Sequence, residues 1–99
     1  MERGGYIYIM SNKTRSVLYI GVTSVLYWRV SEHKSCKGSD FTTKYNCTDL
    51  VYFETFTTIE EAIKREKVLK KWKRDWKDNL IYKLNPDLVD LTENVKDYI

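Results

Sequence analysis

The chain lacks several features that would place it among membrane, zinc-binding or disordered proteins. None of its apolar runs approaches the roughly 18 residues that a membrane span needs. Its two cysteines, Cys36 and Cys47, have no Cys-x-x-Cys spacing, and a single histidine cannot form a histidine cluster, so a zinc site is not expected. Charged residues make up 31% of the chain, but aromatic residues, at 14%, are mixed among them, which argues against disorder.

The N-terminal sequence Met-Glu-Arg-Gly-Gly lacks the basic-then-apolar arrangement of a secretory signal. Together with two thiols that have no evident partner, this predicts a protein of the reducing cytoplasm. With 42% hydrophobic residues, a chain of 99 residues can form one modest core and not two. We therefore expect a single domain over residues 1–86, followed by an acidic C-terminal tail over residues 87–99.

Positive charge is unevenly distributed along the chain, although the net charge is only +3. Residues 64–77 carry eight basic and two acidic side chains, a local charge of +6, whereas residues 87–99 carry a local charge of −3. A basic segment of this kind is typical of proteins that bind a polyanion. The alternative is an ordinary solvated helix face without a partner.

Three segments rich in β-branched and aromatic residues predict strands. Residues 6–10 (YIYIM) and 17–22 (VLYIGV) flank the polar segment 11–16, which predicts a hairpin, and residues 50–56 (LVYFETF) predict a third strand. A symmetric hairpin would set the tyrosine at position 8 opposite the tyrosine at position 19. Because side chains alternate between the faces of a strand, these two phenols and a glycine at position 21 would then share one face.

Two segments predict helices. One spans about residues 25–34, and the other begins at a capping box formed by Thr58 and Glu61 and continues to about residue 72. Whether this second helix breaks near residue 73 or continues is left open by the sequence. Residues 35–46 are polar and are expected to form a long loop.

One acidic residue interrupts the apolar stripe of the second helix. Glu66 lies four residues after Ala62 and three before Leu69, both of which belong to that stripe. A carboxylate that faces a sheet is costly unless it is paired or bound to a cation. Its partner would be a basic side chain such as Arg29, or alternatively Mg²⁺, which typically takes one or two protein carboxylates plus phosphate and water.

These elements, in this order, resemble the GIY-YIG nuclease superfamily, in particular its small single-domain bacterial members. The resemblance covers roughly residues 4–91 and includes "YIGVTS", "FTTKYN", "LVYFE" and "EEAIKREK". The matching motif residues are Tyr6-Ile7-Tyr8, then after ten intervening residues Tyr19-Ile20-Gly21, then Arg29, His33, Glu66 and Asn85. The first triplet starts with tyrosine in place of glycine, which leaves the tyrosine at its third position unchanged.

The resemblance implies an α+β fold, with a central three-stranded sheet flanked by helices, and hydrolysis of DNA phosphodiester bonds with one Mg²⁺ or Mn²⁺ ion per site. By the same resemblance, Tyr8 acts as the general base or orients the attacking water, and Tyr19 supports it. Arg29 holds the phosphate, His33 lies beside the attacking group, and Glu66 binds the metal. A lone helical histidine can also be a packing residue, which remains the alternative for His33.

Further residues are predicted to contact the substrate. They are Lys44 and Tyr45 in the polar segment and Lys70 in the basic segment. The asparagine near the end of the family core matches Asn85, with Asn79 as the competing alignment. An unperturbed phenol titrates near ~10, so a tyrosine serves as a base at neutral pH only where cations stabilise its phenolate.

The expected partner is DNA, with no membrane association. Because little protein lies outside the nuclease core, no separate DNA-reading domain is evident. A protein of this size would act on unusual DNA structures, as in repair or recombination, act weakly, or depend on a protein partner for targeting. The alternative function is a nucleic-acid-binding module with little or no catalytic activity.

Overall fold

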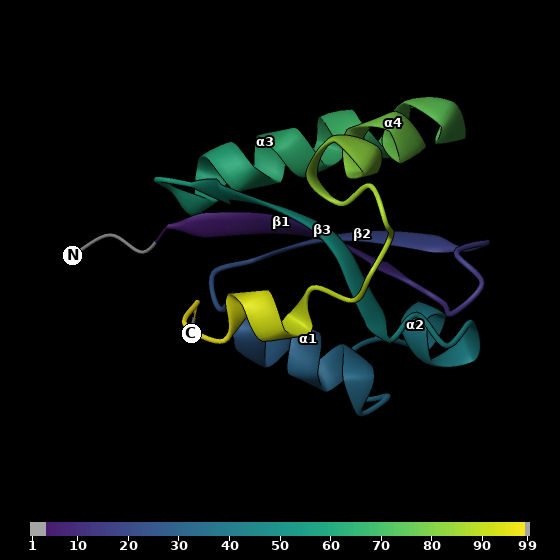
Figure 1. Ribbon diagram of the computed structural model, residues 1–99. Coiled ribbons are helices and arrows are strands. Elements are labelled where there is room, and N and C mark those ends of the chain that lie inside the picture. Colours follow the sequence, from purple (N-terminus) through teal and green to yellow (C-terminus); the bar gives the residue numbers. More distant parts are fainter. Residues whose placement is uncertain (1–3, 99) are drawn as a thin grey trace.

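The computed structural model describes residues 4–98, in which helices cover both faces of a three-stranded antiparallel sheet (Figure 1). The strands lie in the order β2-β1-β3 and are β1 (Gly5–Ser11), β2 (Leu18–Thr23) and β3 (Asp49–Phe56). The helices are α1 (Leu26–Lys34), α2 (Asp40–Lys44), α3 (Ile59–Lys70), α4 (Arg74–Leu84) and the short 3₁₀ helix η1 (Thr92–Val95). This arrangement confirms the predicted α+β fold. None of the helices in the described part of the chain is long and apolar enough to cross a membrane.

The central strand β1 is buried on both faces because side chains alternate along it. Ile7 and Ile9 pack in the core beneath α3 and α4, together with buried residues of both helices. Tyr8 and Met10 pack in the core on the opposite face, which α1 and the C-terminal segment cover (Figure 1). The two faces of the sheet therefore carry separate cores, and the tyrosine of the family motif belongs to the α1 side.

The register of the β1–β2 hairpin differs from the symmetric register expected above. Tyr8 pairs with Gly21, and Met10 pairs with Tyr19. The turn holds Val17, whose backbone N–H donates to the Asn12 side chain at 3.0 Å, so β2 begins one residue later than expected. Each β1 residue thus pairs with the β2 residue two positions beyond its expected partner, as Tyr8 does with Gly21 in place of Tyr19. A shift of two residues leaves each side chain on its expected face.

Gly21 lies directly beneath the ring of Tyr8. A Cβ atom built at this glycine would come within 2.3 Å of Cζ of Tyr8. The space that the glycine leaves above the sheet is therefore filled by the ring of Tyr8. Tyr19 lies on the same face, with its ring centroid 6.4 Å from that of Tyr8.

The polar segment 35–46 is not a loop throughout, as it contains α2. Ser39 caps this helix, because its Oγ accepts a hydrogen bond from the backbone N–H of Thr42 at 3.1 Å. The predicted cap is present at α3, where Oγ1 of Thr58 accepts from the backbone N–H of Glu61 at 3.3 Å and donates to the Glu61 carboxylate at 3.2 Å. The helical segment breaks between α3 and α4, which answers the question that the sequence left open.

The acidic C-terminal segment packs across the α1 face of the sheet. Leu91 and Val95 are buried in the same core as Tyr8. Asp90 holds the segment in place, since its carboxylate accepts from the backbone N–H of Leu50 at 3.0 Å and from Nζ of Lys34 at 2.5 Å. Residues 87–98 thus share a core with the sheet rather than extending away from it (Figure 1).

Candidate active site

The hydroxyl group of Tyr8 lies at the centre of a buried polar cluster. It is 2.9 Å from Nε2 of His33, and it accepts a hydrogen bond from Nε of Arg29 at 3.3 Å. Tyr8 is 1% exposed and His33 is fully buried. Arg29 and His33 are one helical turn apart on α1, so both face the tyrosine on β1. The structure thus brings together three of the residues that the sequence predicted for the site.

Thr42, which α2 contributes, contacts the other nitrogen of the imidazole. Its Oγ1 lies 2.9 Å from Nδ1 of His33 and 2.9 Å from Oγ of Ser39, and it contacts the carbonyl oxygen of Ser39 at 3.3 Å. The tautomer of His33 sets which group donates in its bonds to Thr42 and to Tyr8. Arg29 donates to Tyr8 in either tautomer.

Burial sets the protonation states of the two central groups. Burial raises the pKa of Tyr8 to about 12, although the hydrogen bond from Arg29 opposes this shift. Burial, and then the positive charge of Arg29, lowers the pKa of His33 to about 4. At neutral pH the site therefore contains a neutral phenol hydrogen-bonded to a neutral imidazole. In this resting state, Arg29 alone does not keep Tyr8 as a phenolate.

A row of aromatic rings extends from the cluster through Tyr19 on the edge strand β2 to Phe41 and Tyr45 at α2. The ring centroid of Tyr19 is 5.3 Å from that of His33 and 5.8 Å from that of Phe41. Phe41 lies 4.8 Å from Tyr45, and Nζ of Lys44 lies 5.3 Å from the centre of the Tyr45 ring. The predicted substrate residues at positions 44 and 45 are therefore connected to the tyrosine cluster through a phenylalanine.

Sequence reasoning missed what α2 and the segment before it contribute. Thr42 and Phe41 were part of an expected loop, and neither belongs to a periodic pattern that would single it out. Gly38 was also overlooked, although a Cβ atom there would come within 2.2 Å of Nδ1 of His33. The available signals were this glycine beside several threonines and the family-like sequence FTTKYN, which contains Phe41 and Thr42.

Glu66 lies on the other side of the sheet from Tyr8 and Arg29. Its helix, α3, covers the face opposite α1 (Figure 1), and its carboxylate pairs with Nζ of Lys70 at 3.3 Å, not with Arg29 as expected from the sequence. Lys70 lines a hollow of about 250 Å³ along β2, which Tyr19 and Phe41 also line. Because β2 is an edge strand, Tyr19 from the α1 face and Lys70 from α3 can line the same hollow, whose lining does not include Glu66.

The surroundings of Glu66 suit a metal site with a single protein ligand. Its side chain is 16% exposed, so water reaches the carboxylate, and its partner Lys70 is a solvent-exposed ammonium group that a cation can replace. Within residues 4–98, no group of three or more His, Cys, Asp or Glu side chains is arranged to hold a metal. A divalent ion here would take one carboxylate from the protein and its other ligands from water and phosphate.

The basic segment is only partly neutralised by acids. Three of its side chains form ion pairs, namely Arg65 with Glu54, Lys70 with Glu66, and Arg74 with Asp78. Lys77 forms no ion pair within residues 4–98 and lines the same hollow as Lys70 and Tyr19. Positive charge from α3 and α4 thus reaches the edge of the sheet where the aromatic row begins.

Asn85 and Asn79 occupy different environments. Asn85 is buried, and its side-chain amide donates to the carbonyl oxygens of Val51 and Val89 and accepts from the backbone N–H of Val89. Its polar groups therefore join the C-terminal segment to β3. Asn79 is exposed on α4. Because Asn85 has this structural function, we do not include it in the site proposed below.

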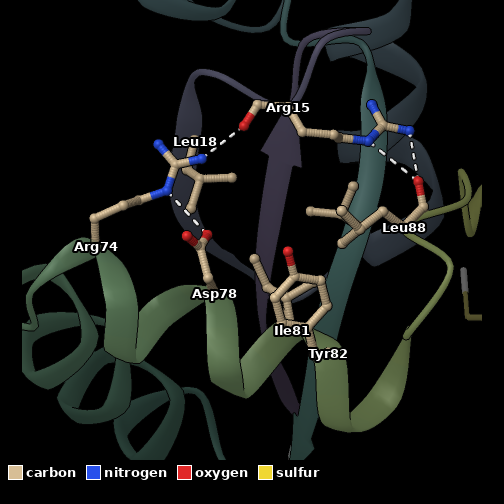
Figure 2. Close-up of a pocket in the computed structure, with 8 residues that line it drawn as sticks. Arg15, Leu18, Arg74, Asp78, Ile81, Tyr82 and Leu88 are labelled. Carbon is tan, nitrogen blue, oxygen red and sulfur yellow. Dashed lines mark hydrogen bonds and ion pairs between the residues drawn. The ribbon is translucent and has the colours of Figure 1, made fainter.

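A second, smaller hollow of about 70 Å³ lies beside α4 (Figure 2). Two arginines line it, and both are already bonded. Arg74 pairs with Asp78 at 2.9 Å and donates to the carbonyl oxygen of Arg15 at 2.6 Å, while Arg15 donates to the carbonyl oxygen of Leu88 at 2.9 Å. These contacts tie the β1–β2 turn to α4 and the C-terminal segment, so this hollow is part of the scaffold.

The family model of the GIY-YIG catalytic domain matches residues 4–79, a range that includes Tyr8, Glu66 and Asn79 but not Asn85. No solved structure matches the chain.

The chain is also similar to several bacterial proteins of comparable size. It is 30% identical over 96 residues to a UPF0213 protein of Bacillus pumilus, an alignment that covers 97% of this chain and 98% of that protein. It is 40% identical over 76 residues to a UPF0213 protein of Clostridium perfringens, covering 77% and 81%, and 37% identical over 76 residues to one of Staphylococcus epidermidis, covering 77% and 92%. These names state no activity. With the family match and the arrangement of its motif tyrosines, the chain belongs to the GIY-YIG family, a superfamily of nucleases.

Proposed function

We propose that this chain is a divalent-metal-dependent DNA endonuclease in which Tyr8 takes the proton of the attacking water. The observation that carries the proposal is the hydrogen bond between Oη of Tyr8 and Nε2 of a neutral His33, 2.9 Å long. One lone pair of this hydroxyl accepts from Arg29, and the other remains to accept from water. Membership of a nuclease superfamily supports the class of reaction.

The proton is passed along the buried cluster. In the tautomer that this step uses, His33 carries its proton on Nδ1 and Nε2 is an acceptor. As water transfers its proton to Oη of Tyr8, the phenol transfers its own proton to Nε2 of His33, and the phenolate never has to accumulate. The low pKa of His33, about 4, is partly due to the charge of Arg29. A phosphate group bound to Arg29 offsets that charge, so substrate binding raises the pKa of His33 and makes it a better proton acceptor.

Arg29 both holds the phosphate and covers the reacting hydroxyl. Its Nη1 atom contacts Oε1 of Glu32 at 3.5 Å, a weak pairing at a solvent-accessible position. Guanidinium groups bind phosphate in a bidentate manner and more strongly, so a phosphodiester replaces this carboxylate. The same movement turns Arg29 outward and gives water access to the hydroxyl of Tyr8, which is otherwise buried.

Glu66 would hold the divalent ion, Mg²⁺ or Mn²⁺, at the outer edge of β2. When bound, such an ion supplies positive charge that neutralises the scissile phosphate and stabilises the leaving oxygen. Lys70 and Lys77 attract the strand to the hollow beside β2, and Lys44 and Tyr45 contact it farther along. Tyr19 supports the site by packing between His33 and the aromatic row.

We place this activity in the cytoplasm, on DNA intermediates of repair or recombination, with a protein partner for targeting. One observation favours the alternative function, a nucleic-acid-binding module without turnover. The hydroxyl of Tyr8 is almost fully buried and its pKa is raised, which is a poor resting state for a base.

The two functions are separated by incubating labelled single-stranded, duplex, flap, fork and junction DNA with Mg²⁺, with Mn²⁺ or with EDTA. Glu60→Gln is the matched control for Glu66→Gln, because Glu60 is an exposed acid on the same helix. We expect metal-dependent cleavage by the wild type and by Glu60→Gln, and a loss of about 100-fold or more in Glu66→Gln.

Binding that weakens steeply with salt, without cleavage in either metal, would favour the binding module. Cleavage that persists in Glu66→Gln would refute its assignment as the metal ligand. Mn²⁺ provides a readout that does not depend on activity. In the wild type it should broaden the backbone NMR signals around Glu66, and in Glu66→Gln it should not.

A further inference from the structure

We propose that the aromatic row beside Tyr19 binds unpaired bases, so that the substrate is DNA with a single-stranded segment at the cleavage site. This inference rests on the proposed nuclease function and names the substrate class of the same site. Phe41 and Tyr45 are large apolar side chains, yet they are 42% and 41% exposed. Their rings are neighbours, and Phe41 joins them to the buried cluster through Tyr19. Bases that stack here are therefore connected to the proposed reaction centre.

The hollow next to this row has the chemistry of a nucleotide site. Its apolar lining comes from Leu18, Ile20, Tyr19 and Phe41, and its charge comes from the ammonium groups of Lys70 and Lys77. A nucleotide presents the same combination, with a flat apolar base attached to an anionic phosphate. Aromatic rings within a positively charged groove are the general means by which proteins bind single strands.

Duplex DNA fits the aromatic row less well than a single strand does. In a duplex the faces of the bases are covered by their neighbours, and only base edges and phosphates are presented to a protein. Phe41 has no hydrogen-bonding group with which to read a base edge, so its exposed ring gains contact area only from the face of an unstacked base. The lysines alone would bind either form, because phosphates are common to both. We therefore expect selectivity for unpaired bases without strong preference for sequence.

The inference is tested by binding in EDTA, where no turnover occurs. The probes are a fluorescent oligothymidine, an oligomer of abasic sites of the same length, and a blunt duplex, each measured by anisotropy. The first two differ in their bases and not in their phosphates. If bases stack on the row, the wild type should bind oligothymidine about 5- to 150-fold more tightly than the abasic oligomer for each base stacked.

Phe41→Leu should reduce the affinity for oligothymidine towards that for the abasic oligomer and leave the abasic affinity unchanged. Tyr45→Leu should also reduce the affinity for oligothymidine and leave the abasic affinity unchanged. This second variant keeps the test valid if Phe41→Leu disturbs the fold. Tyr82→Leu is the matched control, since Tyr82 is a comparably exposed aromatic residue on α4 beside the other hollow. Lys77→Gln should weaken binding of all three probes alike.

An equal loss for all probes in Phe41→Leu and Tyr45→Leu, or no loss in either, would overturn the inference. These outcomes are distinct from failure of the proposed function. A protein that never cleaves can still show the preference for bases in EDTA. Conversely, metal-dependent cleavage of blunt duplex at the rate found for single strands, unchanged in Phe41→Leu, would leave the nuclease function standing and refute the preference for unpaired bases.

Discussion

The single histidine of the chain allows its protonation to be followed without interference from others. Burial, and secondarily the charge of Arg29, lowers the pKa of His33 to about 4, whereas the same side chain titrates near 6.5 in an unfolded chain. Because the folded pKa is depressed, the unfolded state binds more protons at pH values between these two. The contribution of His33 to stability is therefore complete above about pH 6.5 and is lost as the pH falls through 4.

The size of this effect follows from linkage. Between pH 7.5 and pH 5, the two pKa values predict that His33 alone lowers the free energy of unfolding by about 2 kcal/mol. The titration of Asp90 does not add to this change in stability between pH 7.5 and pH 5. Burial opposes its ionisation, but hydrogen bonds from Lys34 and Thr92 outweigh this effect and lower its pKa below the ordinary carboxyl value. Its contribution is therefore lost at lower pH.

The assay combines urea denaturation at several pH values with NMR of the imidazole Cε1 proton. We expect the imidazole signal of the wild type to titrate with a midpoint near pH 4. Between pH 7.5 and pH 5, the free energy of unfolding of His33→Gln should fall by about 2 kcal/mol less than that of the wild type. A midpoint near 6.5, or the same pH dependence in both proteins, would refute the conclusion that the buried cluster holds a neutral histidine.

Two substitutions test the packing around the site. In Gly21→Ala, the new Cβ would lie within 2.3 Å of Cζ of Tyr8, so the ring must move; we expect a loss of about 1–3 kcal/mol in urea denaturation, and an unchanged midpoint would contradict the close contact. Asp90→Asn keeps the shape of the side chain but removes the charge that binds Lys34 and the backbone N–H of Leu50. We expect a loss of about 1–3 kcal/mol and faster hydrogen exchange at the amide of Leu50, whereas unchanged exchange would show that the C-terminal segment is held by other contacts.

Much of the fold could be predicted because long elements have periodic apolar residues. Ile7 and Ile9 on β1, and Ala62 and Leu69 on α3, have the spacing that a buried strand or helix requires. α2 could not be predicted in this way. It is five residues long, and its cap at Ser39 gives no apolar period, so the segment resembles a loop.

Local geometry predicted part of the site. Arg29 and His33 are four residues apart, so the sequence places them on one side of a helix, whereas their approach to Tyr8 was expected from the family resemblance. The position of Glu66 was not predictable, because an apolar stripe shows that a helix faces a sheet but not which face of the sheet it covers. Phe41 reaches the site only through the packing of α2, which no local pattern encodes.

The central claim is that the hydroxyl group of Tyr8 takes part in phosphodiester hydrolysis. Single-turnover cleavage of a single-stranded oligonucleotide in Mg²⁺ by the wild type, Tyr8→Phe and Tyr82→Phe tests it most directly. We predict that Tyr8→Phe binds the oligonucleotide normally but cleaves it about 100-fold or more slowly, and that Tyr82→Phe behaves as the wild type. Cleavage by Tyr8→Phe at the wild-type rate would contradict the claim.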